Sequence, residues 1–142
     1  MKEKLIFLST SFLSLIAPAA PIIYIAIFSI IVDACFGMWK SYKLDGINSI
    51  SSRKASVSIS KFFLYAGAIM FVYLIEKYVA GDLIAHFISI DLILTKLVGL
   101  YLVVVEVKSM NENYKAVTGK DILSKFKSFV VRAKNEVDDL KL

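Results

Sequence analysis

The side chains most able to do chemistry in this chain are Asp91 and Lys96, because both stand inside a long apolar run. An ionised group near the centre of a bilayer costs roughly 2.5 to 3.5 kcal/mol, so each should face protein, water or an opposite charge. Their five-residue separation is poorer than the four that pair charges along one helix. They are expected to pair between helices, or Lys96 reaches a headgroup. Two roles are open for these residues. They serve only the structure of the chain, or they belong to a surface that lines water or contacts another subunit.

The other reactive residues do not form a catalytic or metal site. His86 is the only histidine and Cys35 the only cysteine, too few for the three or four nitrogen and sulfur ligands of a zinc site. Cys35 is predicted to be a small buried thiol, and His86 to lie near a membrane surface. The sequence has no Gly-rich phosphate loop and no nucleophile with a nearby base. We therefore predict no enzyme activity, no metal and no cofactor.

Three apolar runs must position these residues, and their lengths are typical of membrane spans. The run from Leu5 to Val32 has no charged side chain, and two more cover Val57 to Ile75 and Leu83 to Val105. A helix rises about 1.5 Å per residue, so about 20 apolar residues cross a hydrocarbon core roughly 30 Å thick. The predicted fold is an all-α integral membrane protein with about three transmembrane helices. A short N-terminal apolar helix precedes them, and a C-terminal amphipathic cytoplasmic helix follows.

The first run is interrupted at Ala17-Pro18-Ala19-Ala20-Pro21. Proline lacks an amide donor and clashes with the carbonyl four residues earlier, so a continuous helix should kink or stop here. Residues 1–20 are predicted to form an N-terminal apolar segment, tilted or lying in the interface. Two alternatives stay open. Lysines before an apolar stretch and a small-x-small site also fit a cleaved signal peptide, and a tight re-entrant hairpin would place the N-terminus inside.

The net charge of +5 is distributed in a way that indicates topology rather than nucleic-acid binding. Short cytoplasmic connections of membrane proteins are enriched in Lys and Arg. The basic loop 40–56 is therefore predicted inside the cell, the turn 76–86 outside and the charged tail 106–142 inside. Residues 21–105 form the predicted transmembrane domain, and the N-terminus is outside if the first run crosses once.

Small and polar residues recur at helical spacing within the predicted spans. Such side chains let helix backbones approach closely in lipid, where the hydrophobic effect does not drive association. They serve either ordinary packing within one chain or contacts between subunits. Asp91, Thr95 and Gly99 are predicted to share one helical face. The packing and pore candidates are Ser29, Asp33, Gly37, Gly67, Asp91, Thr95, Lys96 and Gly99.

The tail after Val105 is first strongly polar and then amphipathic. Thr118, three residues before Asp121, resembles a capping box at the start of a helix. Downstream, apolar residues recur every three or four positions while lysine and arginine occupy the other faces, which predicts a basic amphipathic helix. This helix either lies on an anionic inner leaflet or packs on neighbouring tails.

The order of these features resembles the phage holin family of the toxin-secretion and phage-lysis type. The first span ends in Asp33-x-x-x-Gly37, and a basic loop with Ser51-Ser52-Arg53-Lys54 precedes Lys61 at the start of the second span. The third span ends in a motif similar to the family's Glu-x-x-Ser-x-x-Glu-Asn signature. The motif residues are Glu106, Ser109, Glu112 and Asn113. The resemblance covers roughly residues 20–120, and Lys96 inside a span departs from it.

This resemblance implies a protein that accumulates in the host cytoplasmic membrane, oligomerises with itself and forms lesions. The lesions would release or activate a cell-wall-degrading endolysin, with or without direct contact, and no nucleic acid is involved. Two other classes remain: a non-lytic anchor or scaffold that recruits a partner through its tail, and a small channel or transporter using Asp91 and Lys96. The lack of a convincing internal repeat argues against a transporter.

Overall fold

The computed structural model describes residues 2–46 and 52–139, and every regular element in these residues is helical. The predicted all-α class is therefore confirmed. The predicted basic loop 40–56 lies partly outside the described residues. In chain order the elements are α1 (Lys2–Ile16), the 3-10 turn η1 (Ala17–Ala19), α2 (Ala20–Asp45), α3 (Ser52–Ile75), the π-helical turn η3 (Glu76–Ala80), α4 (Gly81–Ala85), α5 (Ile93–Thr118) and α6 (Ile122–Asp139).

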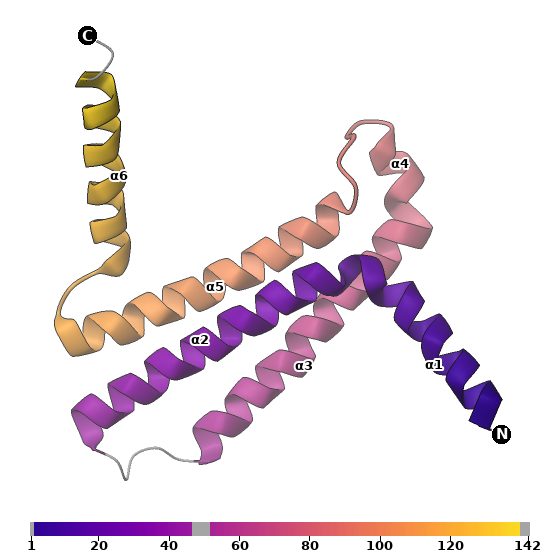
Figure 1. Ribbon diagram of the computed structural model, residues 1–142, viewed down its shortest axis with the longest axis horizontal. Helices are drawn as coiled ribbons and strands as arrows, with labels where there is room; N and C mark the ends of the chain where they lie inside the picture. The colour runs from indigo at the N-terminus through magenta and orange to yellow at the C-terminus, as the bar shows by residue number, and fades with distance from the viewer. Residues whose placement is uncertain (1, 47–51, 140–142) are drawn as a thin grey trace.

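The helices α2, α3 and α5 form an elongated bundle in which α2 and α5 run parallel and α3 runs in the opposite direction (Figure 1). At about 1.5 Å per residue, helices of 24 to 26 residues are long enough to cross a bilayer. One end of the bundle, here called the loop end, holds Asp45 and Thr118. The other end, the α4 end, holds Ala20 and the connection from η3 to α5.

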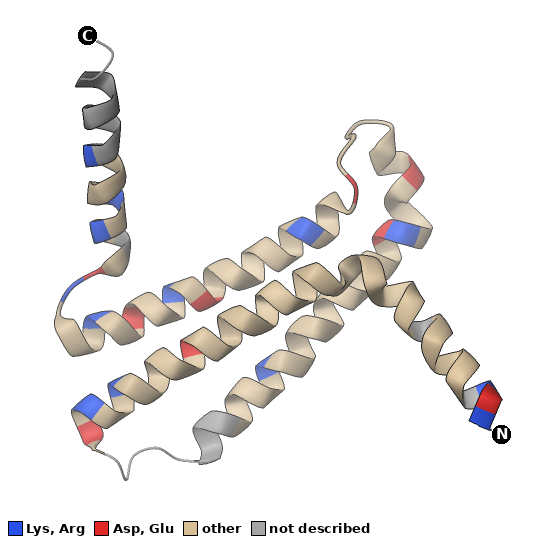
Figure 2. Cartoon of the chain, viewed as in Figure 1, with Lys and Arg blue, Asp and Glu red and all other residues tan. Residues whose placement is uncertain are grey.

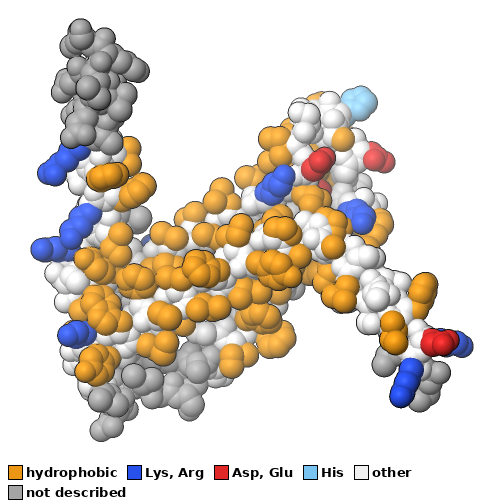
Figure 3. All heavy atoms as spheres, in the orientation of Figure 1, with side chains coloured by type: hydrophobic (Ala, Val, Ile, Leu, Met, Phe, Trp, Pro, Cys, Tyr) orange, Lys and Arg blue, Asp and Glu red, His pale blue; other side chains and the backbone are white. Residues whose placement is uncertain are grey.

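The bundle is apolar on its outside and small or polar on much of its inside. Large side chains such as Phe28, Phe63 and Phe71 are about two-thirds exposed, and hydrophobic side chains cover much of the visible surface (Figure 3). This distribution suits lipid rather than water as the surrounding medium. Two helical stretches, Lys2–Asp45 and Ser56–Ala85, are long and apolar enough to cross a membrane.

The predicted interruption of the first run occurs at η1, where Pro18 breaks the regular helix between α1 and α2. The helix α1 leaves the bundle at an angle (Figure 1). Because the last carbonyls of a helix lack intrahelical partners, they need other donors. Tyr73 on α3 supplies one: its hydroxyl donates to the Leu15 carbonyl at 2.8 Å, which ties the end of α1 to the bundle.

The third apolar run, predicted as one segment from Leu83 to Val105, is divided in two. The short helix α4 ends at Ala85, and α5 begins only at Ile93, after Leu92 in a left-handed conformation with φ +56°. Asp91 therefore precedes the helix, and the prediction that it shares a helical face with Thr95 and Gly99 was wrong. The apolar part of α5 is correspondingly shorter than the predicted span.

Two local predictions were also wrong. Thr118 does not begin a helix: its hydroxyl donates back to the Tyr114 carbonyl at 2.9 Å, and Gly119, at φ +68°, ends α5. Asp121 takes the capping role instead, because its carboxylate accepts the Ser124 amide at 3.3 Å. Cys35 is exposed on the outside of α2 rather than buried, because the inner face of the helix is occupied by smaller and polar side chains.

Candidate functional site: charged residues inside the bundle

The inner face of α2 brings an acidic side chain into the bundle. Ala26 and Ser29 on this face are buried, and the Ser29 hydroxyl donates to the Ala26 carbonyl at 2.7 Å, so it needs no further partner. Asp33 follows one turn later, with 13% of its side chain exposed. Its carboxylate oxygens lie 3.2 Å from Lys61 Nζ on α3 and 3.3 Å from the Asn113 amide nitrogen on α5.

The helix α5 contributes a second acid, Glu106, which is completely buried. One carboxylate oxygen lies 2.9 Å from Lys61 Nζ, and the other accepts a short hydrogen bond from the Tyr65 hydroxyl. One lysine on α3 is thus held between carboxylates from the two flanking helices (Figure 2). The residues of this charged cluster are Asp33, Lys61, Tyr65, Glu106 and Asn113.

The charged cluster lies deep within the bundle. Asp33 and Glu106 are each the fourteenth residue of a 26-residue helix. Burying an ion costs several kcal/mol unless close partners and hydrogen bonds compensate it, so breaking one contact should weaken the whole arrangement. No buried side-chain nitrogen or oxygen lacks a partner among the residues that the structure describes. The cluster therefore ties the three helices of the bundle together at one level.

A second buried acid, Glu76, stabilises the start of α5. It is the first residue of the π-helical turn η3, and its side chain is buried. Its carboxylate accepts the amides of Leu94 and Thr95, both at 2.9 Å, and the Thr95 hydroxyl at 2.6 Å. A carboxylate at a helix N-terminus satisfies orphan donors and complements the helix dipole. Glu76 thereby fixes the residue at which α5 begins.

We expect Glu76→Gln to destabilise the bundle by about 1–3 kcal/mol. The substitution removes the negative charge and replaces one of the two accepting oxygens with an NH₂ group, which cannot accept a hydrogen bond. Thermal unfolding of the purified chain in detergent, followed by circular dichroism, measures the change. Asp82→Asn is the matched control, since Asp82 is exposed close by in α4. Equal melting temperatures for Glu76→Gln and the parent chain would contradict the assigned role.

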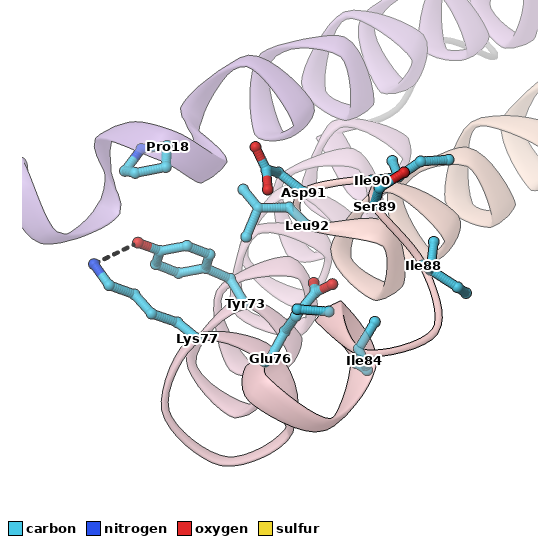
Figure 4. Close-up of a pocket in the computed structure, with 12 residues that line it drawn as sticks. Pro18, Tyr73, Glu76, Lys77, Ile84, Ile88, Ser89, Ile90, Asp91 and Leu92 are labelled. Atoms are coloured by element: carbon cyan, nitrogen blue, oxygen red, sulfur yellow. Dashed lines mark hydrogen bonds between the residues drawn. The ribbon is translucent and has the colours of Figure 1, made fainter.

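A cavity of about 500 Å³ opens beside Glu76 at the α4 end. Figure 4 shows its wall formed by Tyr73 near the end of α3 and Lys77 in η3, with Asp91 and Leu92 from the connection before α5. Lys77 donates to the Tyr73 hydroxyl at 3.0 Å. Asp91 is exposed at this cavity and Lys96 is exposed on α5. Within the described part of the chain neither residue forms an ion pair, so the first of the two expected arrangements, pairing between helices, is not found.

The predicted small residues occupy different environments. A Cβ atom on Gly99 would collide with the Ile22 methyl group on α2. The side chain of Ile22 therefore packs directly against the backbone of α5 at Gly99. A Cβ atom on Gly37 would lie 3.8 Å from Asn113, an ordinary contact, and one on Gly67 would meet nothing within 4 Å. Thr95 is completely buried under Glu76.

The four residues of the tail motif are divided between two environments. Glu106 and Asn113 point into the bundle, Ser109 is half-buried, and Glu112 is exposed. Sequence reasoning placed Glu106 at the start of the tail and did not identify Lys61 and Tyr65 as its partners. It also did not identify Glu76 as the residue that binds the start of α5. The sequence did contain a signal for this cluster. Charged residues of opposite sign, Asp33, Lys61 and Glu106, lie in or at the edge of the three apolar runs, and packing of the three helices brings them to the same level of the bundle.

Comparison with known proteins identifies the family of this chain. A family model described as the bacteriophage holin family matches residues 11–135 of the 142. No curated protein and no solved structure matches the chain. The matched segment includes the whole bundle and every residue of the charged cluster. The chain therefore belongs to the bacteriophage holin family.

Proposed function

We propose that this holin accumulates in the host cytoplasmic membrane as a closed bundle and then oligomerises to form lesions that release or activate an endolysin. The single observation that carries the proposal is the charged cluster, which places ions inside a bundle whose outside is apolar. Packed helices keep these ions paired and largely buried, whereas separated helices would turn them toward water. The same chain can then exist in a sealed and a permeable state.

The proposed topology has three crossings, by α2, α3 and α5. Its support is that the loop end gathers the connection after α2 and the end of α5, while Lys40 and Lys43 add positive charge near the same end. Because positive connections stay in the cytoplasm, the loop end and the tail are assigned to the inside. The α4 end, with the junction of α1 and α2, is then outside.

Part of the small-residue surface is proposed to contact other subunits. Gly67 supports this role, because it is exposed on α3 and leaves open space above its backbone. Ser29, Thr95 and Gly99 are proposed to seal the closed bundle, since they are buried between its helices. Two further pairs are proposed to join the wetted surface of the lesion: Asp33 with Gly37 on α2, and Asp91, in the connection before α5, with Lys96 in the first turn of α5.

The test is induced expression in a bacterium, with culture density and entry of a membrane-impermeant dye followed through time. We expect normal growth during a lag, followed by abrupt dye entry once the protein reaches a critical density. A membrane anchor without lytic activity would instead allow steady growth at high expression, and that outcome would overturn the proposal.

A further inference from the structure

The C-terminal helix α6 presents an apolar face that no part of the described chain covers. Phe126 and Phe129 are 66% and 68% exposed, and Val130 is about half exposed. Their spacing of three and four residues places them on one side of the helix. Two exposed phenylalanines on one helix face are costly in water, so this face requires a partner.

The charged residues next to these phenylalanines, within 122–132, are all basic, and the acidic residues of α6 lie nearer its end, at 136, 138 and 139. Residues 122–132 contain Lys125, Lys127 and Arg132 and no acidic residue, and all three cations are exposed. Successive residues are turned by about 100° around a helix, so Lys125 and Lys127 flank Phe126 on opposite sides. Lysines in such flanking positions can extend toward headgroup phosphates while the aromatic rings enter the acyl boundary.

The turn between α5 and α6 sets the direction of this face. Gly119 reverses the backbone with its positive φ, and the Ile122 amide donates to the Asn111 side chain on α5 at 2.8 Å. As a result α6 leaves the bundle at a steep angle (Figure 1). In Figure 3 the hydrophobic side chains of α6 lie on the side turned toward the bundle, and the blue side chains lie on the other side. Because Phe126 and Phe129 on this side remain exposed, the apolar face of α6 looks into the space beside the bundle, which the surrounding medium occupies.

We propose that α6 binds the anionic phospholipid surface at the loop end of the bundle. The proposal rests on the membrane insertion described under the proposed function. Charge complementarity favours this partner over a second copy of the chain, because the three basic residues within 122–132 would repel their counterparts across a paired face, while the three acidic residues of α6 all lie beyond that stretch. An anionic leaflet attracts each of them and accepts the apolar face at the same time. Through its bond to Asn111, the bound helix holds the end of α5 at the membrane surface.

The experiment uses the full chain in vesicles, with a single tryptophan as the reporter. Trp39→Phe removes the only native tryptophan, and Phe129→Trp places the reporter on the apolar face of α6. A matched control carries Phe63→Trp, which lies on the exposed apolar surface of α3. Fluorescence is measured in vesicles of brominated phosphatidylcholine, with and without phosphatidylglycerol, at low and high salt.

We expect the reporter at position 129 to be quenched and blue-shifted in the anionic vesicles, and less so without phosphatidylglycerol or at high salt. Lys127→Gln should lower the ratio of bound to free helix roughly fivefold, as expected for one basic group at an anionic surface. The control reporter at position 63 should be quenched under every condition.

Three outcomes overturn the inference. A water-exposed reporter at 129 beside a quenched reporter at 63 rejects lipid binding by α6 and leaves membrane insertion intact. Shielding at 129 that depends on the ratio of protein to lipid and not on lipid charge assigns the face to a second copy. Loss of quenching at both positions rejects membrane insertion itself.

Discussion

Lys61→Met is expected to destabilise the closed bundle by about 3–5 kcal/mol, because it leaves the fully buried Glu106 without its cation. Asp33 loses its ion pair in the same substitution. If the closed bundle is the state that precedes lysis, its destabilisation should bring the onset of lysis forward at equal protein accumulation. Unfolding in detergent measures the first effect, and the time of dye entry after induction measures the second.

The matched control for this prediction is Lys96→Met, since Lys96 is exposed and has no ion pair within the described residues. A second variant, combining Asp33→Asn, Lys61→Met and Glu106→Gln, removes every charge from the cluster. It should recover much of the lost stability, because a neutral interior avoids the cost of an unpaired ion. Wild-type stability and timing in Lys61→Met would show that the cluster does not hold the bundle.

Gly99→Leu is expected to separate α2 from α5 at the α4 end. Even a single Cβ atom at this position collides with the Ile22 methyl group, which belongs to a β-branched side chain with little freedom to move. Overpacking of this kind costs about 1–3 kcal/mol, and a leucine should reach or exceed the upper value. The melting temperature in detergent should fall, and lysis should begin at a different time.

Gly67→Leu is the control, because its new side chain would point into open space. It should leave the melting temperature of the single chain unchanged. Combining Ile22→Ala with Gly99→Ala should restore part of the stability that Gly99→Ala loses alone, since it removes the colliding methyl group. Equal melting temperatures for Gly99→Leu and Gly67→Leu would contradict close packing at Gly99.

The sequence was sufficient for features that depend on local physics. Proline at position 18 predicts the break between α1 and α2, because a missing amide and a steric clash act within one turn. Apolar runs predict helices in lipid, and apolar residues that recur every three or four positions predict the amphipathic character of α6. The family resemblance also followed from the order of short motifs along the chain.

Features that depend on contacts between distant segments were not predicted. The start of α5 at Ile93 is set by Glu76, which is 18 residues from Leu94 along the chain. Lys61 and Glu106 are 45 residues apart, and nothing local to either residue specifies their pairing. Asp91 and Lys96 drew attention because they interrupt an apolar run, but Asp91 lies in a connection where its charge remains exposed.

The central claim is that a dry bundle becomes wet when lysis begins, and the reactivity of a buried thiol measures this directly. Cys35→Ser removes the native thiol, and Ser29→Cys places one at a position that is 5% exposed. N-ethylmaleimide enters cells and reacts with thiolates, which form in water and not in an apolar interior. A cysteine replacing Phe63 on the apolar exterior serves as the control. We predict that the thiol at position 29 is unreactive throughout the lag and becomes labelled when dye enters, while the thiol at 63 stays unlabelled. Lysis without any labelling at position 29, or labelling there from the start of expression, would contradict the account.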